Sequence, residues 1–228
     1  MVFLQELLNL EDPVEQNLDW VNQSSLNVSM GYTYPLALRS LMRQDPEIIM
    51  VGEIRDLETA QMAIQAALTG HLVLSTLHTN DAPSSITRLL DLGLPSYLIS
   101  STILGVMAQR LVRTLCPNCK EEMPADEKVW NALVHPWKAP APKTFAHPVG
   151  CLECRNTGYL GRQGIYEIMP LSEPLQKSIN AGAGLLELKQ EAMKEGMRTL
   201  RLSGAQKVAA GTTTIEEVLR VAPTPDQS

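Results

Sequence analysis

The sequence predicts an α/β fold with a mostly parallel sheet, joined to a small tetracysteine subdomain and a helical carboxyl-terminal region. In the first half of the chain, short apolar runs alternate with stretches of helical periodicity, which is typical of strands connected by crossover helices. Four cysteines then follow in two close pairs, and helical periodicity returns from about Ser172. We therefore expect three parts, residues 1–115, 116–168 and 169–228.

Strands and helices alternate along the first part. The expected elements are, in order, a strand at Leu7–Leu10, a helix at about Pro35–Arg43, a strand at Ile48–Val51, a helix at about Leu57–Leu68, a strand at Leu72–Leu77 and a helix after Asp81. The run at 48–51 is fully apolar, which suits a parallel strand that is covered on both faces. Between the cysteine pairs, residues 120–150 are rich in Lys, Pro and Ala and show little periodicity, so we interpret them as an insertion.

The composition is that of an ordinary globular protein. The 228 residues are 44% hydrophobic and 19% charged, enough for one large domain or two small ones. A net charge of −6 argues against nucleic acid as a direct partner. The first residues meet acidic side chains rather than a basic stretch, so we predict no signal peptide and a soluble, cytoplasmic protein.

The four cysteines form two C-x-x-C pairs, Cys116/Cys119 and Cys151/Cys154. Two intervening residues let both thiolates of a pair face one tetrahedral cation, and two such pairs complete a four-thiolate zinc site. Four protein ligands leave no open coordination position, so this zinc would be structural. Two disulfides or redox-active dithiols are the alternatives, and the expected cytosolic location argues against disulfides.

Acidic residues follow two of the predicted strands. Glu11, Asp12 and Glu15 come after the first strand, and Glu53 follows Ile48–Val51 and a glycine. Ligands of open parallel sheets bind outside the carboxyl ends of the strands, where a carboxylate can hold Mg²⁺ or orient a water that attacks a phosphate. Turn formation or helix capping alone would explain Glu11 and Asp12, whereas the position of Glu53 favours a functional role.

Two arginines and two histidines are further candidates. Arg39 and Arg43 are spaced i, i+4 on one helix face, so both guanidinium groups can reach one phosphate chain, although a solvated face is the simpler explanation. His71 and His78 bracket a strand and fall on opposite faces, so no shared metal site is expected. Either imidazole can donate to a phosphate oxygen, and His71 is equally compatible with a structural role.

A phosphate-binding loop is missing from these residues. The P-loop motif G-x-x-x-x-G-K-[ST] requires a glycine followed by lysine, and no glycine here is followed by lysine. The first lysine of the chain is Lys120. The candidate carboxylates therefore lack the partner that usually cradles a nucleotide.

Several motifs follow one another in a fixed order. They are Leu10–Glu15, Leu41–Glu47, Ile49–Asp56, Thr69–Asn80, Gln109–Cys116 and the two cysteine pairs. Together these motifs resemble the traffic ATPase E family, the motor ATPases of type II secretion and type IV pilus assembly. The resemblance covers essentially the whole chain, and it implies that the sheet is an incomplete RecA-like P-loop NTPase core.

The resemblance also implies roles for the candidate residues. Glu53, in a Walker B-type strand, would be the catalytic or Mg²⁺-linked carboxylate. In the family's acidic box, Glu15 would orient the attacking water and Asp12 would join the Mg²⁺ shell, beside Glu11. Arg39 and Arg43 would approach the nucleotide, and His71 and His78 would sense phosphate or lie at a subunit interface. The implied cofactors are ATP with Mg²⁺ and a structural Zn²⁺.

The implied assembly is a homohexamer at the cytoplasmic face of the inner membrane, in contact with platform and cytoplasmic-adaptor proteins of the secretion or pilus machine. Family members carry an amino-terminal domain and a P-loop ahead of the acidic box, which this chain does not include. We therefore expect a carboxyl-terminal part of such a motor that does not hydrolyse ATP alone. The alternatives are a non-catalytic module that docks to the ring or platform, and a zinc-ribbon nucleic-acid binder, which the net charge disfavours.

Overall fold

The computed structural model describes residues 7–222 and divides into two compact units. The first unit contains residues 7–104 together with Pro170–Glu191, and the second contains Gly105–Met169 together with residues 192–222. None of the helices between residues 7 and 222 combines the length and hydrophobicity that crossing a bilayer requires. The chain thus leaves the first unit at Leu104, returns at Pro170 and leaves it again after Glu191.

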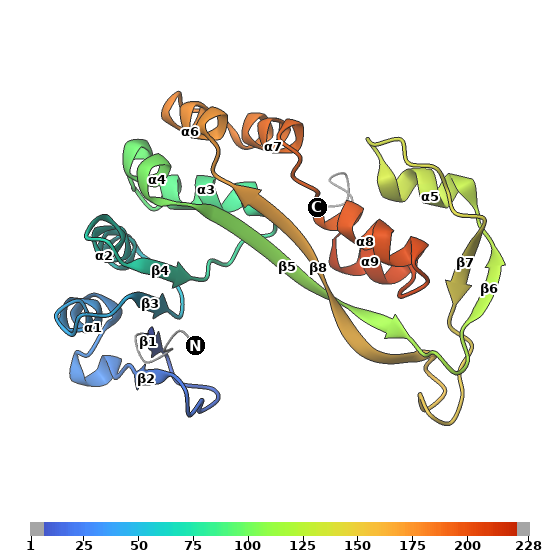
Figure 1. The fold of residues 1–228 in the computed structure, drawn as a ribbon, viewed down its shortest axis with the longest axis horizontal. Helices are drawn as coiled ribbons and strands as arrows, with labels where there is room; N and C mark the ends of the chain where they lie inside the picture. Colours follow the sequence, from blue (N-terminus) through green and yellow to red (C-terminus); the bar gives the residue numbers. More distant parts are fainter. Residues whose placement is uncertain (1–6, 223–228) are drawn as a thin grey trace. The chain divides into compact units, whose positions relative to one another are not determined.

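The first unit is built on a four-stranded parallel sheet with the strand order β2-β1-β3-β4 (Figure 1). The strands are β1 (Leu7–Glu11), β2 (Asn22–Ser25), β3 (Ile48–Val51) and β4 (Leu72–Ser75). Its helices are α1 (Tyr34–Leu41), α2 (Leu57–Leu68), α3 (Ala82–Asp91), α4 (Ser96–Thr102), α6 (Glu173–Asn180) and the start of α7 (Leu185–Lys194), and a short 3₁₀ turn lies at Val28–Met30. The prediction of an α/β fold with a parallel sheet is confirmed.

The core of this unit lies between the sheet and α1. Leu10, Ile49 and Val51 point from the strands into a cluster with Ala37 and Leu38 of α1, and all five side chains are fully buried. The alternation of side chains along a strand therefore assigns the neighbouring residues, including Asn9 and Glu11, to the opposite face. The sheet is thereby fixed in register by apolar contacts on one face.

Two predicted helices can be compared directly with the structure. The helix predicted at Leu57–Leu68 is confirmed as α2, and Asp56 caps it by accepting a hydrogen bond from the backbone N–H of Thr59 at 2.8 Å. The helix predicted to reach Arg43 ends at Leu41 instead. Asp45 then adopts a left-handed conformation (φ 56°) immediately before Pro46. Proline disfavours helical geometry in the residue that precedes it, so the helix ends before this point.

The second unit contains two long paired strands, a short antiparallel strand pair and three helices among its described residues. The long strands are β5 (Gly105–Leu115) and β8 (Tyr159–Pro170), which run in opposite directions (Figure 1). The short pair consists of β6 (Glu121–Pro124) and β7 (Thr144–His147), and the helices are α5 (Glu127–Val134), which lies between these two strands in the sequence, α8 (Leu200–Ala209) and α9 (Ile215–Val221). Thr214 caps α9, and its side chain accepts a hydrogen bond from the backbone N–H of Glu217.

The insertion between the cysteine pairs is more ordered than its composition predicted. Residues 120–150 contain β6, α5 and β7, and Asp126 caps α5 by accepting from the backbone N–H groups of Lys128 and Val129. Trp130 of α5 is buried against Phe145 of β7, with ring centroids 5.9 Å apart. β6 and β7 lack the continuous apolar runs that predicted the strands of the first unit, and α5 has only about two turns, so neither composition nor periodicity predicted them.

Asp81 caps α3 and forms an ion pair with a lysine that is distant in the sequence. Its carboxylate accepts from the backbone N–H of Ser84 at 3.0 Å and lies 3.1 Å from Lys189 Nζ. Asp81→Asn keeps the cap and removes the ion pair, whereas Asp81→Ala removes both. We expect Asp81→Ala to lower the free energy of unfolding by about 1 kcal/mol more than Asp81→Asn, measured by urea denaturation.

The same comparison has a defined pH dependence. Burial raises the pKa of Asp81, but hydrogen bonds from Ser84 and the charge of Lys189 outweigh it and hold that pKa below its ordinary 3.8. The stability gained from ionised Asp81 is therefore complete above pH 3.8 and is lost as the pH falls through the depressed pKa. A difference between wild type and Asp81→Asn that grows below pH 3.8 would contradict this account.

Candidate functional site

The acidic segments that follow β1 and β3 meet at the carboxyl-terminal ends of these parallel strands, which we call the sheet edge. The backbone N–H of Gly52 donates to the carbonyl of Leu10 at 2.8 Å, so the turn after β3 lies directly beside the end of β1. This contact places Glu53 next to the acidic turn that contains Glu11 and Asp12. The sheet register thus brings together carboxylates that lie about forty residues apart in the sequence.

Glu53 is the centre of this edge. Its carboxylate lies 2.6 Å from Arg55 Nη2 and 2.9 Å from His78 Nε2, and its side chain is only 16% exposed. The hydrogen bond from Arg55 lowers the pKa of Glu53 below its ordinary value, burial opposes this shift, and His78 lowers the pKa further. Glu53 is therefore ionised at neutral pH, and its two partners are exposed side chains that can move away.

Tyr34 closes the site from the first turn of α1. The backbone N–H of Glu53 donates to its phenol oxygen. Burial raises the pKa of Tyr34 above 10.0, and the negative charges of Glu53 and Asp12 raise it further. Tyr34 therefore lies among the same charges as Glu53 and stays protonated at neutral pH.

The three carboxylates of the acidic turn, those of Glu11, Asp12 and Glu15, differ in their contacts. Glu11 Oε1 accepts hydrogen bonds from the side-chain amides of Asn9 and Gln23, both at 2.7 Å, which fixes this carboxylate against the sheet. The side chains of Asp12 and Glu15 are exposed. Their charges are free to face a ligand at the sheet edge.

The remaining sequence candidates lie apart from Glu53. His71 precedes β4, and its Nδ1 lies 2.8 Å from the carbonyl oxygen of Ala66 at the end of α2. His71 therefore lies at the amino-terminal ends of the parallel strands, whereas Glu53 lies at their carboxyl-terminal ends. Arg39 is exposed on the last turn of α1, and Arg43 lies beyond the end of that helix. The structure thus brings together Glu53, His78 and the acidic turn, and leaves the assignments of Arg39, Arg43 and His71 as predictions.

Arg55 and Tyr34 are the site residues that sequence reasoning missed. Arg55 lies two residues after Glu53, in the motif Ile49–Asp56, whose only predicted site residue is Glu53. Tyr34 lies nineteen residues before Glu53, and its contact depends on how α1 packs on the sheet. The short spacing of Glu53 and Arg55 was the available signal.

The four cysteine sulfurs converge in the second unit. All four Sγ atoms lie within 4.8 Å of one another, and the shorter separations are 3.9 Å for Cys116–Cys151, 3.8 Å for Cys119–Cys154 and 3.7 Å for Cys151–Cys154. A tetrahedral Zn²⁺ with Zn–S bonds of about 2.3 Å requires sulfur–sulfur distances of about 3.8 Å. The cysteines are free rather than disulfide-bonded, so their geometry fits a four-thiolate metal site.

Backbone amides prepare these sulfurs for the thiolate form. The N–H groups of Cys151 and Gly158 each donate to Cys154 Sγ at 3.2 Å, and the N–H of Gly150 donates to Cys119 Sγ at 3.3 Å. Burial raises the pKa of Cys154, but these donors outweigh it and lower the pKa to about 6. Burial and the neighbouring thiols raise the pKa of Cys119 to about 11. A bound cation would stabilise all four thiolates together.

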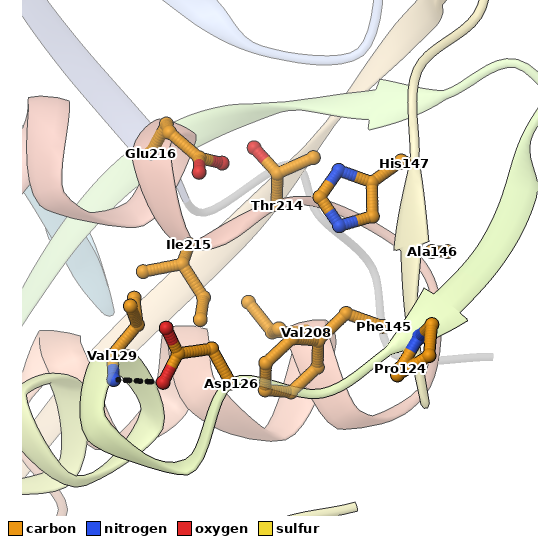
Figure 2. A pocket seen from close by; sticks show the side chains of 10 residues that line it. All are labelled: Pro124, Asp126, Val129, Phe145, Ala146, His147, Val208, Thr214, Ile215 and Glu216. Atoms are coloured by element: carbon orange, nitrogen blue, oxygen red, sulfur yellow. Dashed lines mark hydrogen bonds between the residues drawn. The ribbon is translucent and has the colours of Figure 1, made fainter. Parts of the chain in front are cut away.

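A small pocket elsewhere in the second unit contains none of the predicted residues. It has a volume of about 120 Å³, with Phe145, Val208 and Ile215 among its apolar lining and Asp126, His147 and Glu216 around it (Figure 2). Figure 2 also shows Asp126 turned toward the N–H of Val129, where it serves as the cap of α5. The pocket thus shares no residue with the sheet edge or the cysteine cluster.

A glycine substitution tests the close approach of β1 and β3. A Cβ atom at Gly52 would lie 2.8 Å from the Tyr34 hydroxyl and 2.9 Å from the carbonyl oxygen of Leu10. We expect Gly52→Ala to lower the free energy of unfolding by about 1–3 kcal/mol in urea denaturation, because backbone must shift. Gly184→Ala is the matched control, since a Cβ there meets open space. Equal stability of the two variants would refute the close approach.

Metal analysis tests the cysteine cluster. We expect one zinc per chain in protein purified under reducing conditions, and a substoichiometric amount in Cys154→Ser, measured by elemental mass spectrometry. Glu153→Gln changes the exposed neighbour in the same turn and should retain the metal. Two disulfides and no zinc in the wild-type chain would show that the disulfide alternative is correct.

The sequence of this chain is similar to those of known proteins. The profile of the family "Type II/IV secretion system protein" matches residues 4–220. The type IV pilus assembly ATPase TfpB of Acinetobacter baylyi is 54% identical over 94% of this chain and 37% of its own length. The type II secretion system ATPase E of Vibrio cholerae is 46% identical over 95% of this chain and 42% of its own length. The chain thus spans about two fifths of these relatives.

A solved structure agrees with the sequence relatives. The pilus retraction motor PilT, crystallised with bound ADP, superimposes with a TM-score of 0.67 and 25% identity, over 99% of this chain and 56% of PilT. The ATPase DotB of Legionella pneumophila shares the fold, with a TM-score of 0.63 and 20% identity over 97% of this chain and 52% of its own. From the profile match and the close relatives, we conclude that this chain belongs to the type II/IV secretion system protein family.

Proposed function

We propose that this chain supplies the hydrolytic sheet edge and the zinc subdomain of an ATP-driven motor of type II secretion or type IV pilus assembly. The observation that carries the proposal is the Glu53 carboxylate, which is mostly buried at the carboxyl edge of a parallel sheet and is held ionised by Arg55 and His78. Relatives named as secretion and pilus ATPases support it.

Each candidate residue has a proposed role at this edge. Bound Mg²⁺ would neutralise charge on the phosphates of ATP. Glu53 orients a water or holds one on the cation, while Asp12 and Glu15, exposed on the acidic turn, extend the carboxylate shell. Glu11 is fixed by Asn9 and Gln23 and shapes the turn.

The cationic candidates would act from further away. Arg39 and Arg43 are exposed and can turn toward phosphate oxygens when the nucleotide or a neighbouring subunit approaches. His78, which contacts Glu53, would sense the charge at that carboxylate, and we propose His71 as an interface or phosphate-sensing residue.

The boundaries at 115/116 and 168/169 remain our proposal for the functional division of the chain.

The phosphate cradle would come from residues other than these 228, because they contain no P-loop motif. We propose that the working assembly is a cytoplasmic homohexamer peripheral to the inner membrane, in contact with platform and adaptor proteins and without direct nucleic-acid contact. The four cysteines would hold a structural Zn²⁺ in each subunit.

A chimera tests the role of Glu53. In the chimera, this chain replaces the matching segment of TfpB, to which it is 54% identical, and TfpB supplies the rest of the motor. We expect the chimera to hydrolyse Mg²⁺-ATP and Glu53→Gln to reduce kcat by about 10²–10⁴-fold. Glu47→Gln is the matched control, because Glu47 is an exposed acid at the opposite end of β3 and should leave kcat unchanged.

The outcome separates the proposal from its alternative. Hydrolysis that survives Glu53→Gln would contradict the assignment of Glu53. A correctly folded, zinc-containing chimera without turnover would favour the non-catalytic module that docks to the ring or platform.

A further inference from the structure

Three arginines from distant parts of the sequence line one hollow in the second unit. Arg113 lies on β5, Arg162 on β8 and Arg220 near the end of α9, and together with Leu111 they line a cavity of about 570 Å³. None of the residues assigned to the sheet edge or to the cysteine cluster is among them. Like charges gathered in one place repel each other, and a nearby negative charge reduces this repulsion.

One compensating charge is built into the fold. Glu217, which is 2% exposed, lies 2.6 Å from Arg113 Nη2 and 3.0 Å from Arg220 Nη2, and its second oxygen also accepts from the backbone N–H of Arg113 at 3.1 Å. The hydrogen bond from Arg113 is the main reason that the pKa of Glu217 falls to about 2, against the opposing effect of burial. Glu217 therefore carries a full negative charge at neutral pH.

The same contacts fix two of the guanidinium groups. Arg113 stacks over the ring of Tyr159, 4.1 Å from its centroid, in addition to its bond with Glu217. Arg220 is held by two hydrogen bonds to Glu217, one from Nε at 3.2 Å and one from Nη2. Arg113 and Arg220 are therefore positioned before any ligand arrives, which reduces the entropy lost on binding.

Arg162 completes the hollow from the opposite strand. Within residues 7–222, its guanidinium makes no hydrogen bond or ion pair, so all of its donors are available. Three positive charges against the one negative charge of Glu217 leave a net charge of +2. A phosphate monoester or inorganic phosphate carries about −1.5 to −2 at pH 7, whereas a carboxylate carries −1.

We propose that the hollow between Arg113, Arg162 and Arg220 binds a dianionic phosphate group. Guanidinium groups offer paired N–H donors that match the spacing of phosphate oxygens, and three of them converge here from separate elements. The phosphate can belong to a soluble phosphate compound or to a lipid with a terminal phosphate monoester. The site shares no residue with the proposed nucleotide edge and does not depend on ATP hydrolysis.

Titration of the zinc-loaded 228-residue chain with inorganic phosphate tests the proposal. We expect the arginine Nε–Hε signals of Arg113, Arg162 and Arg220 to shift together in NMR spectra with one dissociation constant. Arg162→Gln should weaken this binding at least tenfold, because it removes a charge-assisted hydrogen bond to the phosphate. Arg162→Lys keeps the positive charge but loses the paired N–H donors of the planar guanidinium, so we expect an intermediate loss of phosphate affinity.

Arg198→Gln is the matched control, because Arg198 is an exposed arginine of the same unit and the substitution removes the same charge. Its affinity for phosphate should equal that of the wild type. Equal weakening by Arg162→Gln and Arg198→Gln would overturn the proposal, as would unchanged binding in Arg162→Gln.

Vesicles distinguish the two sources of phosphate. Phosphatidylcholine vesicles with and without phosphatidic acid, sedimented with the wild-type chain and with Arg162→Gln, measure lipid binding. Arg162-dependent binding to phosphatidic acid alone would support a lipid ligand, and binding of free phosphate alone would support a soluble one. The absence of both would refute the site.

Discussion

The register between β1 and β3 is the constraint on which the candidate site depends. The two strands are parallel and pair Leu10 with Val51, so both end at the same edge of the sheet. Apolar side chains on the face that α1 covers lock this register, because a shift of one residue would expose Leu10 and Val51. The positions of Glu11, Asp12 and Glu53 then follow from the backbone alone, before any contact between their side chains.

The two units are stabilised in different ways, and their chemistry differs accordingly. At the sheet edge, a mostly buried carboxylate meets exposed partners, since the side chains of Arg55 and His78 are 70% and 81% exposed. Such partners contribute little stability and can be exchanged for a ligand. In the second unit, the cysteine sulfurs are oriented by backbone N–H groups and leave no open position on a tetrahedral cation. The first arrangement suits turnover, and the second suits structure.

The sequence predicted the elements whose local signals agree with their packing. The helix 57–68 combines a capping Asp56 with a continuous apolar face, and the strand 48–51 is apolar throughout, so both were predicted with their observed bounds. The cysteine spacing likewise predicted the convergence of four sulfurs. By contrast, the pairing of Glu53 with His78 spans 25 residues and depends on the turn after β4, which no periodicity encodes. The convergence of Arg113, Arg162 and Arg220 depends on the pairing of β5 with β8 and was equally invisible.

Hydrolysis of Mg²⁺-ATP by the 228-residue chain itself tests the central claim, that its sheet edge supplies the catalytic carboxylate and depends on a phosphate cradle from elsewhere. Turnover should be measured at protein concentrations where circular dichroism and zinc content show an intact fold, with Glu53→Gln beside the wild type. The account predicts no turnover above the buffer background for either protein. Robust hydrolysis that disappears in Glu53→Gln would contradict it, because the chain would then contain a phosphate-binding element within its own 228 residues.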